Sequence, residues 1–136
     1  LTDIRGQWSL VFMGFTNCGH VCPMTMAQLR VIHDSLAEPV NVIFVSVDPN
    51  RDSPAVIKDY VRRFDTGFRG ITGSAEALEQ LASNLGAPLY VDTSPDNYIV
   101  DHTSAVFLLD RSASLAGTIT PPFDIDRITT ELERIM

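Results

Sequence analysis

Residues 8–23 read WSLVFMGFTNCGHVCP, and this stretch decides how the chain begins to fold. Its first half, residues 8–15, is a short apolar run rich in strand-forming residues, which predicts a buried β-strand. After Pro23 the apolar residues recur at helical spacing, and proline is well tolerated in the first turn of a helix. The stretch therefore predicts a strand, a short turn and a helix, with two cysteines where the turn meets the helix.

The residues that follow alternate between helical and strand patterns. Further strands are expected at residues 41–47, 105–109 and 115–119, while residues 88–91 could add a short strand to this order. Further helices are expected after a cap at Ser53 with Pro54, from a cap at Ser74 to a stop at Gly86, and from Ile125, with an apolar face of Ile125, Ile128, Leu132 and Ile135. The turn residues Asp110-Arg111-Ser112-Ala113 lie between the last two strands, which predicts an antiparallel hairpin. The order β-α-β-α-α-β-β-α indicates an α/β fold, with a central mixed sheet flanked by helices. We expect residues 1–136 to form a single domain, because no repeat or linker interrupts them.

Length, charge and composition narrow the classes of function. The net charge of −7 and the lack of a Lys/Arg cluster argue against a nucleic-acid partner. No run of eighteen or more apolar residues occurs in the chain. A chain of 136 residues buries enough surface to fold without a disulfide. A bridge across the two cysteines would constrain the unfolded chain by only about 2 kcal/mol. The cysteines are therefore poorly explained as structural reinforcement.

Cys18 and Cys22 lie where the predicted strand gives way to the predicted helix. Backbone N–H groups and the helix dipole converge at such a position and favour the thiolate form of cysteine. Residues four apart within a helix hold their Cβ atoms about 5–6 Å apart, whereas a disulfide needs about 3.5–4.5 Å. We therefore expect Cys18 in the turn before the helix. The pair could close a disulfide or hold one soft metal ion; the alternative is two ordinary buried cysteines.

Three blocks of sequence resemble the Sco/SenC family of copper-binding, thioredoxin-like proteins that serve cytochrome c oxidase assembly. They are residues 12–23 (FMGFTNCGHVCP), 45–54 (VSVDPNRDSP) and 98–103 (YIVDHT). Residues 70–73 (GITG) add a fourth, shorter match, and together the blocks span most of the chain in the family's order. The resemblance implies a thioredoxin-like fold and places the metal ligands at Cys18, Cys22 and His102.

The donor set agrees with copper as the cargo. Two thiolates and an imidazole are soft to borderline donors, whereas structural zinc usually takes four protein ligands. Three ligands also leave an open position from which a partner can take the ion. Without the resemblance, His102 would be interpreted as a loop histidine hydrogen-bonded to Asp101. With it, Asp101 could orient the imidazole or cap the turn.

The resemblance implies a copper metallochaperone for cytochrome c oxidase. Expected partners are a copper-receiving oxidase subunit, another copper chaperone and thiol-disulfide partner proteins. The alternative is a thiol-disulfide oxidoreductase, in which Cys18 and Cys22 are the catalytic redox pair and His102 is dispensable. A peroxide-reducing enzyme is a third, weaker reading, suggested by Phe15-Thr16 before a helix-start cysteine. Whether the chain is an enzyme is left open.

The resemblance also predicts a periplasmic protein tethered to the inner membrane, although the tether and the family's first hairpin are not within these residues. One departure from the family concerns the cysteine segment itself. The family usually has proline directly after the first cysteine, whereas this chain has Gly19. The change could loosen the segment and alter metal affinity.

Other polar and sulfur side chains near the motifs are expected to play lesser roles. We expect Asp48, Arg51 and Asp52 to form a structural cluster, since carboxylates compete poorly with thiolates for copper(I). Three further candidates are expected outside the site: His20 as an exposed side chain, His33 as a solvated helix residue and Met26 in the core. Met24 is either a soft sulfur donor near the site or a surface residue.

Overall fold

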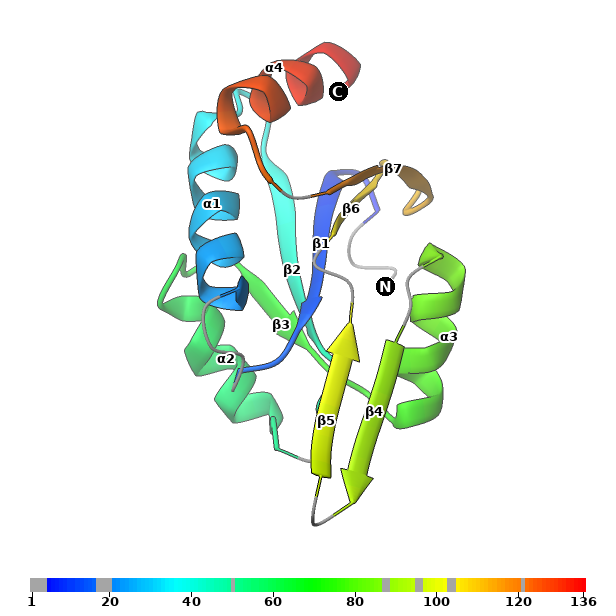
Figure 1. The fold of residues 1–136 in the computed structure, drawn as a ribbon. Coiled ribbons are helices and arrows are strands. Elements are labelled where there is room, and N and C mark those ends of the chain that lie inside the picture. Colours follow the sequence, from blue (N-terminus) through cyan, green and yellow to red (C-terminus); the bar gives the residue numbers. More distant parts are fainter. Residues whose placement is uncertain are drawn as a thin grey trace.

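The computed structural model describes residues 5–16, 21–49, 51–86, 89–94, 97–102, 105–120 and 122–136; for 21–22, 89–94 and 97–102 the description covers the backbone alone. Along the chain the elements are β1 (Trp8–Gly14), α1 (Val21–Ser35), β2 (Val40–Ser46), α2 (Pro54–Arg62), β3 (Arg69–Ile71), α3 (Ala75–Leu85), β4 (Leu89–Ser94), β5 (Asn97–His102), β6 (Val106–Leu109), β7 (Leu115–Ile119) and α4 (Ile125–Ile135). Figure 1 shows α1 and α3 on opposite sides of the central sheet.

The main sheet has five strands in the order β3-β2-β1-β6-β7. β1 pairs in parallel with β2, and β2 pairs in parallel with β3. β6 pairs antiparallel with both β1 and β7. The predicted mixed sheet, with a parallel front half and a following hairpin, is therefore confirmed.

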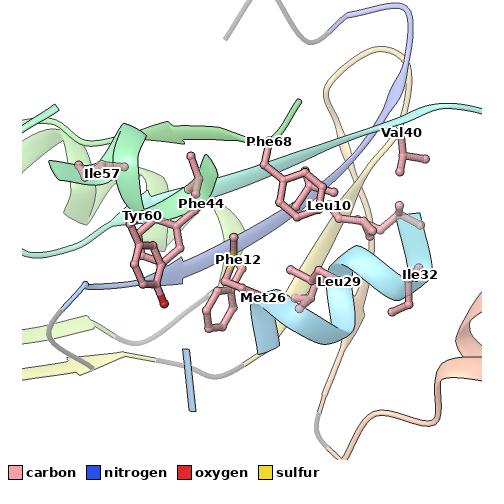
Figure 2. Packing of buried hydrophobic residues seen from close by; sticks show 14 of the residues in the cluster. Leu10, Phe12, Met26, Leu29, Ile32, Val40, Phe44, Ile57, Tyr60 and Phe68 are labelled. Atoms are coloured by element: carbon pink, nitrogen blue, oxygen red, sulfur yellow. The ribbon is translucent and has the colours of Figure 1, made fainter. Parts of the chain in front are cut away.

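Two hydrophobic clusters cover the two faces of this sheet. In β1, Leu10 and Phe12 belong to the cluster that includes residues of α1, α2 and α4, whereas Val11 and Met13 belong to the one that includes residues of α3. Successive strand side chains point to opposite faces, so a strand that is apolar throughout must be covered on both sides. Figure 2 shows the first cluster, where Met26 of α1 lies beside Phe12.

Helix ends form where the sequence predicts them. The Ser53 side chain accepts a hydrogen bond from Val56 N at 3.2 Å, with Pro54 in the first turn of α2. Ser74 caps α3 in the same manner, and Gly86 ends it in the left-handed conformation that glycine adopts at little cost. No helix among the described residues is long and apolar enough to cross a membrane.

The structure corrects the expected order of strands in two places. The predicted strand at 88–91 extends to Ser94 and pairs antiparallel with β5, which the sequence did not predict; the two form a separate sheet. The short strand β3 was also missed, because three residues with two exposed side chains carry no apolar pattern. Gly70 in β3 lies so close to α2 that a Cβ atom would stand 2.2 Å from Ile57 Cγ2. Close packing of α2 explains this glycine.

The last helix departs from its predicted stripe at one position. Leu132 is buried, while Ile125 and Ile128 pack against the core cluster from its margin. Ile135, however, is 48% exposed. Ile135 is the last residue of α4, so it remains exposed although it belongs to the predicted apolar face of the helix.

Candidate metal and thiol site

Three segments that carry the sequence motifs leave the same end of the main sheet. β1 and β2 are parallel, so their C-terminal ends lie together, with Gly14 opposite Ser46. β6 runs antiparallel to β1, and Phe12 pairs with Val106. The residues after β1 and the residues before β6 therefore emerge at one edge. Open α/β sheets place their sites at the C-terminal ends of parallel strands.

The predicted metal ligands belong to two of these segments. Cys22 is the second residue of α1, and His102 is the last residue of β5, four residues before the Phe12 partner Val106. In β5 the His102 backbone pairs with Leu89 of β4. Cys18 lies outside the described residues, as do Gly19 and His20. The expectation that the helix begins at the cysteines is confirmed for Cys22.

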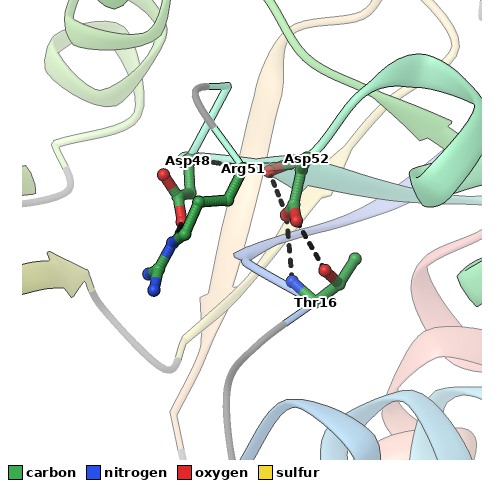
Figure 3. Close-up of polar contacts among 5 residues, drawn as sticks. Thr16, Asp48, Arg51 and Asp52 are labelled. Atoms are coloured by element: carbon green, nitrogen blue, oxygen red, sulfur yellow. Dashed lines mark hydrogen bonds and ion pairs between the residues drawn. The ribbon is translucent and has the colours of Figure 1, made fainter.

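The loop after β2 holds the end of β1 through a buried carboxylate. Asp52 is fully buried, and its Oδ2 accepts hydrogen bonds from Thr16 N at 2.9 Å and from Ser46 Oγ at 2.6 Å. Thr16 Oγ1 donates to Oδ1 of the same side chain at 2.5 Å. Figure 3 shows both bonds from Thr16 converging on Asp52. A buried carboxylate that accepts several hydrogen bonds is compensated for the loss of water.

A second buried carboxylate lies in the same loop. Asp48 is fully buried and accepts a 2.5 Å contact from Arg51 Nε, and its backbone oxygen accepts from Asp52 N at 2.9 Å. The Arg51 guanidinium lies over the ring of Phe15, 5.9 Å from its centroid. The expected structural role of Asp48, Arg51 and Asp52 matches these contacts, since each forms bonds within the loop or to the end of β1.

A groove opens between the N-terminal turn of α1 and the outer side of α2. Thr16 and Pro23, the described residues that bracket the cysteine segment, both line it; Ala55, Val56, Asp59, Tyr60 and Arg63 of α2 and its C-cap line the rest. Its volume of about 610 Å³ is within the range of ligand pockets. Met24, the residue after Pro23, is 61% exposed. Met24 therefore lies at the surface, and the expected core position of Met26 is confirmed.

Elsewhere, within the described ranges, His33, Asp34 and Asp65 bring potential ligand atoms within 4.8 Å of one another. His33 Nδ1 lies 3.0 Å from Asp34 Oδ1, and its ring packs edge-on against Phe68. Asp34 also faces Arg30 at 3.7 Å. The expected solvated histidine is thus half-buried, because its ring covers part of the core edge. These oxygen-rich side chains lack the soft donors that copper(I) prefers.

The sequence did not predict that Thr16 and Ser46 both bind Asp52. Thr16 and Asp52 are 36 residues apart, and pairing of β1 with β2 brings them together. The available signal was a hydroxyl residue near the end of each of two neighbouring strands, Thr16 shortly after β1 and Ser46 at the end of β2. Without the strand register, that signal could not be distinguished from ordinary turn composition.

A mixed sheet covered by helices on both faces, with a cysteine in the first turn of the helix after β1, defines a thioredoxin-like α/β protein. The family model described as SCO1/SenC matches residues 1–136, and the chain belongs to this family.

Two relatives match nearly the whole length of the chain. A protein of Stutzerimonas stutzeri named "Putative copper-binding protein" is 32% identical over 98% of this chain and 68% of its own length. The mitochondrial SCO2 homolog of Bos taurus is 34% identical over 98% of this chain and 53% of its own length. The chain thus spans about half to two-thirds of these relatives.

A solved structure gives the same fold with metal present. The crystal structure of Arabidopsis thaliana ScoI with copper bound superimposes with a TM-score of 0.89 at 26% identity. The match covers 98% of this chain and 86% of that one. The expected fold and family are therefore confirmed.

Proposed function

We propose that this protein is a copper carrier that binds one copper ion through Cys18, Cys22 and His102 and delivers it during cytochrome c oxidase assembly. The observation that carries the proposal is the β1–β6 register. Because Phe12 pairs with Val106 in antiparallel strands, the segment that leads to Cys18 and the one that contains His102 leave the same end of the sheet. Membership of the SCO1/SenC family and the copper-bound Arabidopsis structure support copper as the cargo.

The three donors suit capture and release of a soft ion. Two thiolates and one imidazole match the preference of copper(I) for sulfur and nitrogen donors. With three protein ligands the ion keeps room for an incoming ligand from a partner. A receiving site can therefore form its first bond to copper before the carrier loses its last.

The test is anaerobic titration of the reduced protein with copper(I) against a chromophoric chelator. One equivalent should bind to the wild type, and Cys18→Ser, Cys22→Ser and His102→Ala should each weaken binding by at least about tenfold. His33→Ala is the matched control, because it removes a histidine that lies in α1 away from the cysteine end. Loss of binding in the control alone, or no binding by the wild type, would refute the proposal.

The second candidate function is thiol-disulfide exchange with a partner protein. The thioredoxin-like fold and the position of Cys22 in the first turn of α1 favour it, since a helix N-terminus stabilises a thiolate. His102→Ala separates the two functions. In an oxidoreductase the variant should reduce a disulfide substrate at the wild-type rate, whereas in a copper carrier it should lose copper.

The groove beside the cysteine segment is our proposed route for a partner. Its α2 wall includes the exposed Val56, and Met24, which follows the lining residue Pro23 in the chain, is also exposed. We propose a copper-receiving oxidase subunit, another copper chaperone or a thiol partner as the protein that approaches there. Periplasmic location with an inner-membrane tether is part of the same proposal. Fractionation of cells that express the full gene product should recover it with the inner membrane, facing the periplasm.

A further inference from the structure

The fully buried Asp52 connects three segments near the predicted thiol pair. Its two oxygens face Thr16 N, Thr16 Oγ1 and Ser46 Oγ, and each of these groups donates to it. A carboxylate offers only acceptors, so this arrangement satisfies every group that faces it. The side chain has no exposed surface.

Asp52 is itself held on the rigid side of this connection. Its backbone N–H donates to Asp48 O at 2.9 Å, and the next residue, Ser53, caps α2. Ser46 is the last residue of β2, and its carbonyl accepts from Thr72 Oγ1 at 3.0 Å. The carboxylate is therefore fixed relative to β2 and α2.

Thr16 is the partner nearest the predicted thiol pair in the chain, because it lies after the end of β1 and two residues before Cys18. Asp52 holds it at two points, one on the backbone and one on the side chain. Two bonds to one planar carboxylate fix both the place and the direction of the chain. Arg51 adds a contact to the ring of Phe15.

We propose that Asp52 is a positioning residue for the thiol pair. By fixing Thr16, it sets where the chain enters the segment that contains Cys18, while α1 fixes Cys22. The two sulfurs then meet at a higher effective concentration. Both the disulfide and the two-thiolate metal complex need the sulfurs together, whereas the reduced, metal-free form does not. Loss of Asp52 should therefore weaken both forms in the same direction.

The experiment measures two equilibria in the same set of variants. In a glutathione redox buffer, Asp52→Ala should lower the disulfide-to-dithiol ratio by about tenfold, which corresponds to about 30 mV in reduction potential. Copper(I) affinity should fall by a similar factor. Asp126→Ala is the charge-matched control, because this exposed carboxylate lies in the first turn of α4 and not in the groove beside the cysteine segment. Leu132→Ala controls for stability, because it weakens the core from α4.

Asp52→Asn separates position from charge. Its amide oxygen can still accept from Thr16 N, and the Thr16 hydroxyl can turn to accept from its NH₂ group, so it should stay near wild type. Thr16→Val, which loses only the side-chain bond, should fall between wild type and Asp52→Ala, while Thr16→Ser should restore wild-type values. These variants keep the test available if Asp52→Ala does not fold.

The inference rests on the proposed copper site for one of its two readouts, and the two ideas fail differently. Absence of copper binding in the wild type would refute the proposed function. The glutathione equilibrium would then still test whether Asp52 positions the thiol pair. Wild-type values for both equilibria in Thr16→Val and Asp52→Ala would overturn the inference, as would an equal effect in Leu132→Ala at matched stability. An effect of Asp52→Asn as large as that of Asp52→Ala would also overturn the inference, because it would show that Asp52 acts through its charge and not by positioning Thr16.

Discussion

The two parallel strands β1 and β2 each lead into a helix, and the two connections are built for different tasks. The β2–α2 connection contains two fully buried aspartates, whose oxygens bind groups of the loop and of the neighbouring strand end. The β1–α1 connection contains the two cysteines, and Thr16 at its start takes its anchor from Asp52. The β2–α2 connection therefore provides a rigid support, whereas the β1–α1 connection carries the residues expected to react or bind metal.

Oxidation should have the largest effect, and it should act on the β1–α1 connection alone. A disulfide between Cys18 and Cys22 removes both thiolates and leaves one imidazole, which competes poorly for copper. When both forms are dialysed against the same copper buffer, the reduced protein should hold about one copper ion and the oxidised protein almost none. Equal loading of the two forms would show that the cysteines are not ligands. Copper should in turn slow oxidation, because a ligand stabilises the form that it binds.

Removal of a buried carboxylate from the β2–α2 connection should lower the free energy of unfolding more than a change next to the β1–α1 connection. Asp48→Ala deletes a buried side chain that binds Arg51, and we expect a loss of about 1–3 kcal/mol in the free energy of unfolding. Met24→Ala, which truncates an exposed side chain of α1, should change the free energy of unfolding by less than about 0.5 kcal/mol. Denaturant titration of both variants checks this. A larger loss of unfolding free energy in Met24→Ala than in Asp48→Ala would contradict the assignment of the β2–α2 connection as the rigid one.

A methyl group beneath α2 tests the close packing behind the same connection. Gly70→Ala places a Cβ atom against Ile57 Cγ2, so α2 or β3 must shift, and we expect a loss of about 1–3 kcal/mol. Gly117→Ala is the matched control on β7, where nothing lies within 4 Å of the added atom. Thermal unfolding of the pair should show a lower midpoint only for Gly70→Ala. Similar midpoints would mean that the packing of α2 adapts.

Loss of a helix cap should give the smallest effect. Ser53→Ala removes the acceptor for Val56 N at the start of α2 and should cost about 1 kcal/mol. Because Asp52 keeps its bonds to Thr16, copper affinity should stay at the wild-type value. Ser74→Ala on α3 is the equivalent change far from the motif. A fall in copper affinity for Ser53→Ala and not for Ser74→Ala would show that the cap itself controls the thiol pair.

The sequence predicted elements whose signals are local. The apolar run of β1, the caps at Ser53 and Ser74 and the stop at Gly86 each depend on residues within one element or at its ends. β3 and β5 were missed for the opposite reason. β3 is three residues long with an exposed edge, and β5 is defined by its pairing with β4.

The candidate site divides in the same manner. The resemblance in the motif blocks indicated Cys18, Cys22 and His102, and these ligands stay a prediction, as does the single domain of residues 1–136. The sequence also placed Asp48, Arg51 and Asp52 beside a strand end. Their partners Phe15 and Thr16 were not predicted, because they lie more than thirty residues earlier in the chain.

The sequence by itself determined the family, the run of helices and most strands, and the chemistry of the donors, because motifs, caps and apolar periodicity are carried by neighbouring residues. Only the tertiary structure decided which ends of the strands meet. The parallel β1–β2 register sets Gly14 opposite Ser46, and the antiparallel β1–β6 register sets Phe12 opposite Val106. Long-range pairing of this kind brings Asp52 to Thr16, since a buried carboxylate must find its donors wherever the folded backbone presents them.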